Sequence, residues 1–556
     1  MNTNNNSNIQ SNQVVESKIN EQSETMISFI SKVKSTFPIE RLDLEPEKNY
    51  GYCTTGEKRK IVAGIKVIDS TEIKLLFQLA NEFDVPLYPI SSGKNWGYGT
   101  ALPVENFCAI VDLSLMNKII EVNAKMGWVK LQPGVTQLQL RKYLDENSLN
   151  FMVPTTGAGP HVSILGNALE RGYGITPHKD HFDAVINLEA ILPNGETYHS
   201  VMKELGGQEI HNNFKWGIGP HLDQLFSQSN FGIVTEATVS LCPKPEQVEV
   251  FVFELNSDKE LPQAVEAIRT ISQKYGNFIS GMNLMNQRRV ISMKLKYPQH
   301  LLKKGELVLD DKVVEQVGLK YKIPKWTGVG AIYGTKGVAN AIKTDLKKIL
   351  SFAHKVKFIN TKYVKTIDKI ASVIPSFLGG DNIRSLSSSL KSLTDILEGR
   401  PSEVALPLAY WRSSDQYNSL SSQNLAKDQC GLIWYSPLVT MEETKINSYI
   451  HFVESTCKLF GVEPLITLTS ISDKCFDSTV PILFDKKDLA QKINSEQCYQ
   501  ELFNIGQKIG YFPYRVGVNA MEKITSVKAP GWELVSQIKK AIDPNNILAP
   551  GRYSRS

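Results

Sequence analysis

The first 245 residues alternate short apolar runs with stretches of helical periodicity. After a candidate N-cap at Ser70, apolar side chains recur every three or four positions up to Phe83, which predicts a helix. The apolar run over residues 85–90 then predicts a strand, and a glycine-rich polar loop follows it. Further apolar runs predict strands over residues 108–113, 118–123 and 127–134 and a helix over residues 136–148. This order predicts a mixed α+β region.

A turn and a change of pattern end this region. The turn Pro193-Asn194-Gly195 joins two strand-like runs, residues 185–192 and 196–201. From about residue 246 the pattern changes. It predicts a strand followed by a helix over residues 251–276 and a second such pair over residues 329–350. A further strand is predicted over residues 465–472. We expect a second domain in which an antiparallel sheet is covered by helices.

Length and composition fit a multidomain globular protein. A chain of 556 residues is long enough for two or three domains and for a large cavity. The net charge of +5 comes from 62 basic and 57 acidic residues mixed along the chain, which favours neither a nucleic-acid nor a membrane partner. A small-molecule ligand, including an anionic one, remains compatible with this charge.

Seven cysteines are spread along the chain without a C-x-x-C pair. This argues against a disulfide framework, a zinc site and an iron–sulfur cluster, and it fits a reducing compartment. The first residues are polar and carry no basic patch followed by an apolar stretch, so we expect residues 1–25 to be a disordered tail and not an export signal. These features together predict a cytoplasmic protein.

The polar loop after residues 85–90 is the strongest candidate ligand-binding segment. It comprises Ser91, Ser92, Gly93, Lys94, Asn95, Trp96, Gly97, Tyr98 and Gly99. It is not a P-loop, because Tyr88 stands where a glycine is required, and its glycines are spaced wrongly for a Rossmann fingerprint. A backbone nest that binds a pyrophosphate and a tight turn between two elements both remain as interpretations.

Six motifs together resemble a known family. They are PISSGKNWGYG, LQPGV, GNALERGYGITPHKDHFDAVINLEAILPNGE, WGIGPHLDQLFSQSNFGIVTEATVSLCPKP, GYFPYRV and DPNNILAPGR, in family order from about residue 50 to residue 552. They are similar to motifs of the vanillyl-alcohol oxidase and p-cresol methylhydroxylase flavoproteins.

The resemblance implies an α+β enzyme with a PCMH-type two-part FAD-binding domain and a cap domain whose antiparallel sheet covers the flavin. We expect the FAD-binding domain over residues 26–245, the cap over residues 246–500, and a C-terminal segment, residues 501–556, that returns to the FAD domain. A homodimer is possible, because the family is commonly dimeric or larger.

The same resemblance implies the FAD-binding residues. Ser91 to Gly99 would hold the pyrophosphate, where glycines let main-chain N–H groups approach the phosphates. Further residues that would line the cofactor are Pro133, Gly134, Ser163, Gly166, Asn167, Glu170, Gly172, Gly174, Asn230, Gly232, Ile233, Val234 and Arg515. Taken singly, each glycine fits a structural role equally well.

Four residues bear on the substrate. The resemblance implies that Tyr98, Tyr514 and Arg515 surround a phenol oxygen, and Arg552 matches an arginine of the p-cresol enzyme. Phenolic O–H donors and guanidinium groups stabilise a phenolate, which can then release a hydride from its para-alkyl carbon to the flavin. Alternatively, Arg515 steadies the reduced flavin and the tyrosines are wall residues.

The sequence departs from the family at two pocket positions. The aspartate that acts as acid/base in vanillyl-alcohol oxidase falls at Ala158, and a pocket tyrosine falls at Ile175. His161 is a candidate replacement base, although a local hydrogen-bonding role is the more common one for such a histidine. We interpret the histidine-rich stretch of residues 178–181 as structural and expect no metal.

Flavin attachment is open at this point. No histidine lies near residues 429–435, where the resemblance places the attachment region, so we expect non-covalent FAD or a tyrosyl link through Tyr410, Tyr417 or Tyr435. The predicted function is hydride transfer from a small organic substrate, most favourably a para-substituted phenol, to FAD, with oxygen or an electron-transfer protein as the final acceptor. A non-phenolic alcohol or 2-hydroxy acid as substrate and a flavin-binding protein without turnover are the alternatives.

Overall fold

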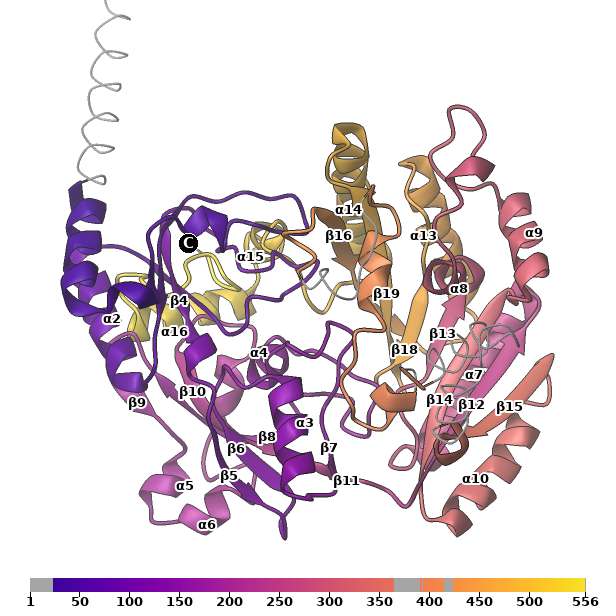
Figure 1. Ribbon diagram of the computed structural model, residues 1–556, viewed down its shortest axis with the longest axis horizontal. Helices are drawn as coiled ribbons and strands as arrows, with labels where there is room; N and C mark the ends of the chain where they lie inside the picture. Colours follow the sequence, from indigo (N-terminus) through magenta and orange to yellow (C-terminus); the bar gives the residue numbers. More distant parts are fainter. Residues whose placement is uncertain (1–23, 365–390, 393, 415–423, 556) are drawn as a thin grey trace, which may run out of the picture.

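The computed structural model describes residues 24–364, 391–392, 394–414 and 424–555. Figure 1 shows two bodies side by side, one formed by the first half of the chain together with the last elements, and one formed by a large sheet with its helices. The predicted polar tail falls almost entirely outside the described residues.

The first body begins with a four-stranded sheet in the order β1-β2-β4-β3. Its strands are β1 (Leu42–Asp43), β2 (Ile61–Lys66), β3 (Leu87–Ile90) and β4 (Cys108–Asp112). The strands β2 and β3 both pair with β4 in parallel, and α2 (Ser70–Phe83) connects them. The N-cap of α2 is Asp69, not Ser70, because the Asp69 carboxylate accepts hydrogen bonds from the N–H groups of Thr71 and Glu72.

A five-stranded antiparallel sheet completes this body, in the order β5-β6-β10-β8-β9. Its strands are β5 (Ile119–Asn123), β6 (Trp128–Leu131), β8 (Val185–Ile191), β9 (Thr197–Tyr198) and β10 (Ile233–Ser240). The predicted turn over residues 193–195 joins β8 to β9. The helices α3 (Gln137–Glu146) and α4 (Ile164–Leu169) lie between β6 and β8 in the sequence, next to the short pair β7 (Phe151–Met152) and β11 (Cys242–Pro243).

The second body is built on an eight-stranded antiparallel sheet in the order β15-β12-β14-β13-β18-β19-β16, with β17 paired to β19. Its strands are β12 (Gln247–Leu255), β13 (Asn283–Asn286), β14 (Trp326–Gly334), β15 (Lys355–Asn360), β16 (Cys430–Tyr435), β17 (Leu438–Thr440), β18 (Thr467–Ser470) and β19 (Cys475–Asp485). This sheet confirms the predicted helix-covered antiparallel architecture.

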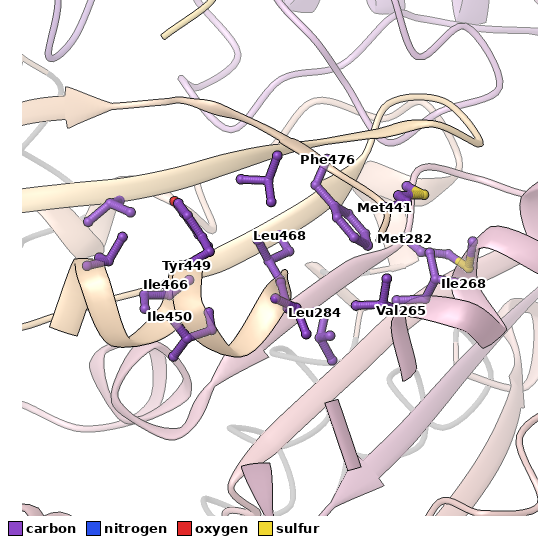
Figure 2. Packing of buried hydrophobic residues seen from close by; sticks show 14 of the residues in the cluster. Val265, Ile268, Met282, Leu284, Met441, Tyr449, Ile450, Ile466, Leu468 and Phe476 are labelled. Atoms are coloured by element: carbon purple, nitrogen blue, oxygen red, sulfur yellow. The ribbon is translucent and has the colours of Figure 1, made fainter. Parts of the chain in front are cut away.

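The two faces of this sheet bury different partners. One face packs against α7 (Leu261–Tyr275), α10 (Lys336–Ile349), α13 (Ile446–Leu459) and α14 (Leu489–Ile509). Figure 2 shows part of this core, with Phe476 of β19 among Leu468, Met441 and Met282. The other face packs against α8 (Gln287–Lys294), α9 (Asp311–Tyr321) and Trp96 of the first body. Because side chains alternate across a strand, successive residues of β19 point to opposite faces.

The end of the chain returns to the first body through α15 (Met521–Thr525) and α16 (Pro530–Ile542). Leu548 forms an isolated parallel bridge with Leu87 of β3. The ammonium of Lys539, which is only 4 % exposed, donates to the carbonyls of Asn230 and Leu548 and pairs with Asp543. These contacts hold residues near position 550 beside the loop that follows β3.

Candidate active site

The glycine-rich loop follows the carboxyl end of β3 and presents free main-chain donors. The N–H groups of Ser92, Gly93 and Lys94 donate to none of the residues that the structure describes. Gly93, Gly97 and Gly99 have positive φ values of 60°, 76° and 118°. A loop of this kind with unpaired N–H groups is an anion-binding nest.

Two of these glycines also allow other parts of the chain to approach the loop. A Cβ atom on Gly97 would lie 2.2 Å from the Trp434 ring of β16, and one on Gly99 would lie 2.7 Å from Val518. The cap sheet and the C-terminal segment therefore both close onto this loop.

The structure brings the predicted cofactor segments 133–134 and 163–167 against the same loop. The Ser163 N–H donates to Ser92 Oγ at 3.2 Å, and the Ser163 hydroxyl donates to the Pro133 carbonyl at 2.5 Å. The Asn167 amide shares a 2.6 Å hydrogen bond with Nδ1 of His181. A Cβ atom on Gly134 or Gly174 would lie 2.7 or 2.5 Å from main-chain carbonyl oxygens, so close packing alone favours glycine at these two positions. At Gly172 and Gly232 the nearest atoms, 2.1 and 2.7 Å away, belong to the side chains of Asn167 and Phe226.

The predicted residues of the 230–234 segment lie at a structural joint. The Asn230 amide donates to the Ala549 carbonyl at 3.0 Å and to Ser554 Oγ at 2.8 Å. Ile233 and Val234 are buried at the start of β10. This segment thus links the five-stranded sheet to the end of the chain.

Arg515 and Tyr98 form the centre of a buried polar cluster. The Arg515 guanidinium carbon lies 4.4 Å from the centroid of the Tyr98 ring, and its Nη2 donates to Asn95 Oδ1 at 2.6 Å. The Tyr98 hydroxyl is 3.0 Å from Ser436 Oγ of the cap. Burial raises the pKa of Tyr98 to about 12, although the Arg515 charge opposes this shift. Tyr98 therefore keeps its proton at neutral pH.

Glu170 joins the two predicted arginines. Its carboxylate pairs with Arg552 and lies 3.4 Å from Nε of Arg515, a contact that is ionic but lacks hydrogen-bond geometry. Arg552 also donates to the Tyr88 hydroxyl at 3.0 Å. The carboxylate neutralises part of the positive charge, and buried Arg515 Nε is left without a hydrogen-bond acceptor in the described residues.

Tyr514 and Tyr173 carry hydroxyl groups that bond to none of the described residues. Their rings meet edge to face, with centroids 5.2 Å apart. The main chain of Tyr514 is fixed, because its N–H donates to the Ser436 carbonyl and its carbonyl accepts from Gln228. Burial raises the pKa of Tyr514 well above its ordinary value, and nearby Asp477 raises it further. Both tyrosines are therefore hydrogen-bond donors.

Asp477 of β19 is a member of this cluster that the sequence analysis missed. It is 5 % exposed, and its Oδ1 has no hydrogen-bond partner in the described residues. Burial raises the pKa of Asp477 to about 7, against the opposing charge of Arg515. Its carboxylate in turn raises the pKa values of Tyr98, Tyr173 and Tyr514. An aspartate within a mostly buried strand was the available signal.

The other candidate base, His161, has a different set of neighbours. Burial and the charge of Lys94 lower its pKa, and Glu403 and Lys142 are its other charged neighbours. None of these residues belongs to the cluster around Arg515. In the stretch 178–181, burial lowers the pKa of His181 to about 3, so the ring that binds Asn167 is neutral.

The three tyrosines considered for flavin attachment differ in position. Tyr435 is fully buried in the core on the helix-covered face of the cap sheet, where its hydroxyl donates to the Tyr511 carbonyl at 3.3 Å. The Tyr410 hydroxyl donates to Asp428 at 2.6 Å. Tyr417 lies outside the described residues. The fold therefore turns Tyr435 away from the glycine-rich loop that contacts its neighbour Trp434.

The described residues fit a flavin dinucleotide. The unpaired N–H groups of residues 92–94 suit a pyrophosphate, and buried atoms without partners, Arg515 Nε and Asp477 Oδ1, lie at the neighbouring cluster. No helix of the described chain is both long and apolar enough to cross a membrane.

Two family comparisons agree with this site. The FAD binding domain family matches residues 64–200, and the C-terminal domain family of FAD linked oxidases matches residues 481–553. These two segments contain the glycine-rich loop and the residues Tyr514, Arg515 and Arg552.

Similar proteins extend over nearly the whole chain. The 1'-carboxy-chondrochloren decarboxylase of Chondromyces crocatus is 29% identical over 503 residues, covering 90% of this chain and 92% of the relative. The 4-cresol dehydrogenase [hydroxylating] flavoprotein subunit of Pseudomonas putida is 27% identical over 497 residues, covering 88% and 87%. The crystal structure of p-cresol methylhydroxylase with substrate bound superposes with a TM-score of 0.82 at 23% identity, covering 96% of this chain and 97% of the other, and therefore shares its fold.

Proposed function

We propose that this chain, which belongs to the vanillyl-alcohol oxidase and p-cresol methylhydroxylase family of FAD-linked oxidoreductases, oxidises para-substituted phenols that it binds as phenolates. The observation that carries the proposal is a tyrosine hydroxyl without a partner in the described residues, in the same cluster as a buried guanidinium. The Tyr514 hydroxyl bonds to none of the described residues and is subject to the charge of Arg515, and the Arg515 guanidinium lies over the Tyr98 ring.

The cluster has the donors that a phenolate needs. The hydroxyls of Tyr98 and Tyr514 stay protonated because burial raises both pKa values, so each can donate to an anionic oxygen. The Arg515 guanidinium adds a positive charge in a site with little water, where charge-assisted hydrogen bonds are strong. Together these groups lower the pKa of a bound phenol and make its ring electron-rich.

Bound FAD supplies the hydride acceptor. The N–H groups of residues 92–94 would hold its pyrophosphate, and Ser92, fixed by Ser163, would position the loop. Arg515, already held by Asn95 and Glu170, would hold its charge close to both the substrate oxygen and the cofactor.

We assign the proton-transfer role, for which the sequence suggested His161, to Asp477. With a pKa of about 7, its carboxyl group can accept a proton at neutral pH and release it again. Its Oδ1 has no hydrogen-bond partner in the described residues and its charge acts on Tyr514, so we assign to this carboxyl group the proton that a phenol loses on binding. A residue of β19 then compensates for the substitution at Ala158.

The relatives support a phenolic substrate. The Pseudomonas putida relative is named for 4-cresol, and it is similar to this chain over most of its length. A second relative is named as a decarboxylase, so phenols with a carboxylate on the para side chain belong among the substrates to be tested.

The test is anaerobic reduction of the FAD-loaded protein by a panel of para-alkyl, para-hydroxymethyl and para-carboxyalkyl phenols, followed by visible absorption. We expect one class to bleach the flavin spectrum. Tyr514→Phe should slow that bleaching by about 10²-fold while the FAD content stays unchanged, because one donor to the oxygen is lost.

The matched control is Tyr275→Phe, which removes a hydroxyl bonded to Asp345 in the outer part of the cap. Its bleaching rate should equal that of the wild type. A Tyr514→Phe protein as fast as this control would contradict the phenolate role, and a wild type that no phenol reduces would move the search to non-phenolic alcohols and 2-hydroxy acids.

A further inference from the structure

A row of polar side chains leads away from Asp477 along the face of the cap sheet that meets the first body. Asp477 of β19 pairs with Thr469 of β18, and Thr469 pairs with Asn283 of β13. Because directly opposite residues point to the same face, the three side chains form one row, roughly 10 Å long at two strand spacings. Thr469 and Asn283 are partly exposed although their strands lie at the centre of the sheet. Space therefore remains over this row.

The helix α8 follows β13 and packs on the same face. Asn286 caps this helix, since its Oδ1 accepts a hydrogen bond from the N–H of Arg289 at 2.9 Å. Val290 and Ile291 of α8 belong to one apolar cluster with Trp96 of the glycine-rich loop. The helix thus lies where the cap meets the first body.

A short helix of the cap connects α8 with the pocket position Ala158. This helix, η8 (Leu406–Tyr410), contacts α8. A Cβ atom on Gly159 would lie 3.3 Å from Leu406, and the Ala158 carbonyl accepts a hydrogen bond from the Trp96 indole at 3.2 Å. The helix α8 and the segment that contains Ala158 therefore border the same region.

Arg289 of α8 is a cation without a counter-ion in the described residues. Its Nη1 donates to Ser292 Oγ at 3.4 Å, and no described carboxylate pairs with it. Its neighbour Arg288, by contrast, pairs with both Glu463 and Asp311. Burial lowers the pKa of Arg289 to about 10, so the guanidinium is still charged at neutral pH.

The unbonded edge of the Arg289 guanidinium is open to a ligand. Its Nε and Nη2 donate to none of the described residues, and neither atom is enclosed by protein. The side chain is only partly exposed and burial governs its pKa, so the guanidinium lines a recess and not the outer surface. An unpaired cation costs free energy in such a place, which is typical of a site that binds an anion.

We propose that Arg289 binds a carboxylate carried by the para side chain of the phenol. The substrate then spans the row, with its phenolate at Tyr514 and Arg515 and its carboxylate at Arg289. The two unbonded nitrogens form one edge of the guanidinium, and this edge makes two parallel N–H···O bonds with a carboxylate. The inference rests on the proposed function, which supplies the phenol end.

The test compares 4-hydroxyphenylalkanoic acids, with one to three methylene groups, with their primary amides as anaerobic reductants of the FAD-loaded protein. At the best length, flavin reduction per unit concentration should be about 100-fold faster with the acid, because only the acid pairs with the guanidinium. Arg289→Gln should remove this preference by slowing the acid, and the rate with the amide should stay within about twofold. Arg289→Lys keeps the charge without the fork and should retain part of the preference.

The matched control is Arg269→Gln, which removes an arginine of α7 that pairs with Glu266 on the opposite side of the sheet. Its preference for the acid should equal that of the wild type. A wild type that accepts acid and amide equally, or an Arg289→Gln protein that keeps the preference, would overturn this inference and leave the phenol assignment standing.

A flavin that none of these phenols reduces would instead contradict the proposed function. Equilibrium dialysis of the acids then still tests Arg289, because binding does not require turnover. The dissociation constant should rise about 100-fold in Arg289→Gln, and equal constants for the two proteins would overturn the assignment.

Discussion

Neighbouring residues of β19 meet two different environments, and the contrast separates stability from chemistry. Phe476 is fully buried among apolar side chains from three parts of the cap (Figure 2). Asp477, the next residue, points to the opposite face, where its carboxyl group lies among tyrosines and Arg515 with one oxygen unpaired. The first face is packed as an apolar core, whereas the second leaves polar atoms of Asp477 and Arg515 without partners in the described residues. Unsatisfied buried polar groups of this kind mark a functional site.

The largest expected effect is the loss of stability caused by Phe476→Ala, which tests the apolar face. Removing a fully buried ring from a close-packed core leaves a cavity and should lower the free energy of unfolding by about 3–5 kcal/mol. Urea unfolding of the FAD-loaded protein measures this loss. The folded fraction should keep its rate of flavin reduction, and a variant that is stable but inactive would show that the two faces are not separate.

Asp477→Asn is expected to lower turnover more than stability, whereas Phe476→Ala lowers stability and leaves the folded fraction active. Replacing the carboxyl group removes proton transfer, so we expect turnover at pH 8 to fall by about 10²-fold. In the wild type, turnover should rise with pH through about 7 as the Asp477 carboxyl group ionises, and in the variant this rise should disappear. A variant with the wild-type pH profile would assign the proton transfer to another group.

The same carboxyl group also links stability to pH. Because burial raises the pKa of Asp477 from near 4 to about 7, the folded protein holds a proton that the unfolded chain has released in this range. Its contribution to the free energy of unfolding therefore falls as pH rises from about 4 to about 7 and is constant above that. The difference in stability between wild type and Asp477→Asn, measured at pH 5 and pH 8, should change in that direction.

The smallest effect is expected from Tyr449→Phe, which tests the helix-covered face of the cap sheet. The Tyr449 hydroxyl donates to Ser478 Oγ, two residues after Phe476, and both groups are fully buried. Losing this hydrogen bond should cost about 1 kcal/mol of stability and leave flavin reduction unchanged. A large loss of activity would mean that the helix-covered face supports the site directly.

More of the candidate site residues could be proposed from the sequence than of the residues that surround them. The loop 91–99 and the residues 514–515 stand in long motifs that carry the family resemblance, so the resemblance could propose them as site residues without coordinates. Asp477 could not be proposed from the sequence, because its environment depends on which face of β19 meets the first body. That orientation is set by the pairing of β19 with β16, β17 and β18. Ser436 was missed for the same reason, since its contact with Tyr98 joins residues 338 positions apart.

Local signals also explain where the fold was predicted well. The capping box of α3, with Thr136 and Gln139, and the turn at residues 193–195 are set by neighbouring residues. The cap of α2 was placed one residue late, because Asp69 and Ser70 are both good N-cap residues and only the backbone conformation distinguishes them.

The return of the C-terminal segment sets an order of events during synthesis on the ribosome. Tyr88 and the glycine-rich loop are made early, whereas Arg552, which bonds Tyr88, follows 464 residues later. A nascent chain therefore carries an incomplete site until almost all of its residues have emerged, and the first body cannot finish folding on its own during translation. A chain whose synthesis stops within the cap therefore lacks both Arg515 and Arg552.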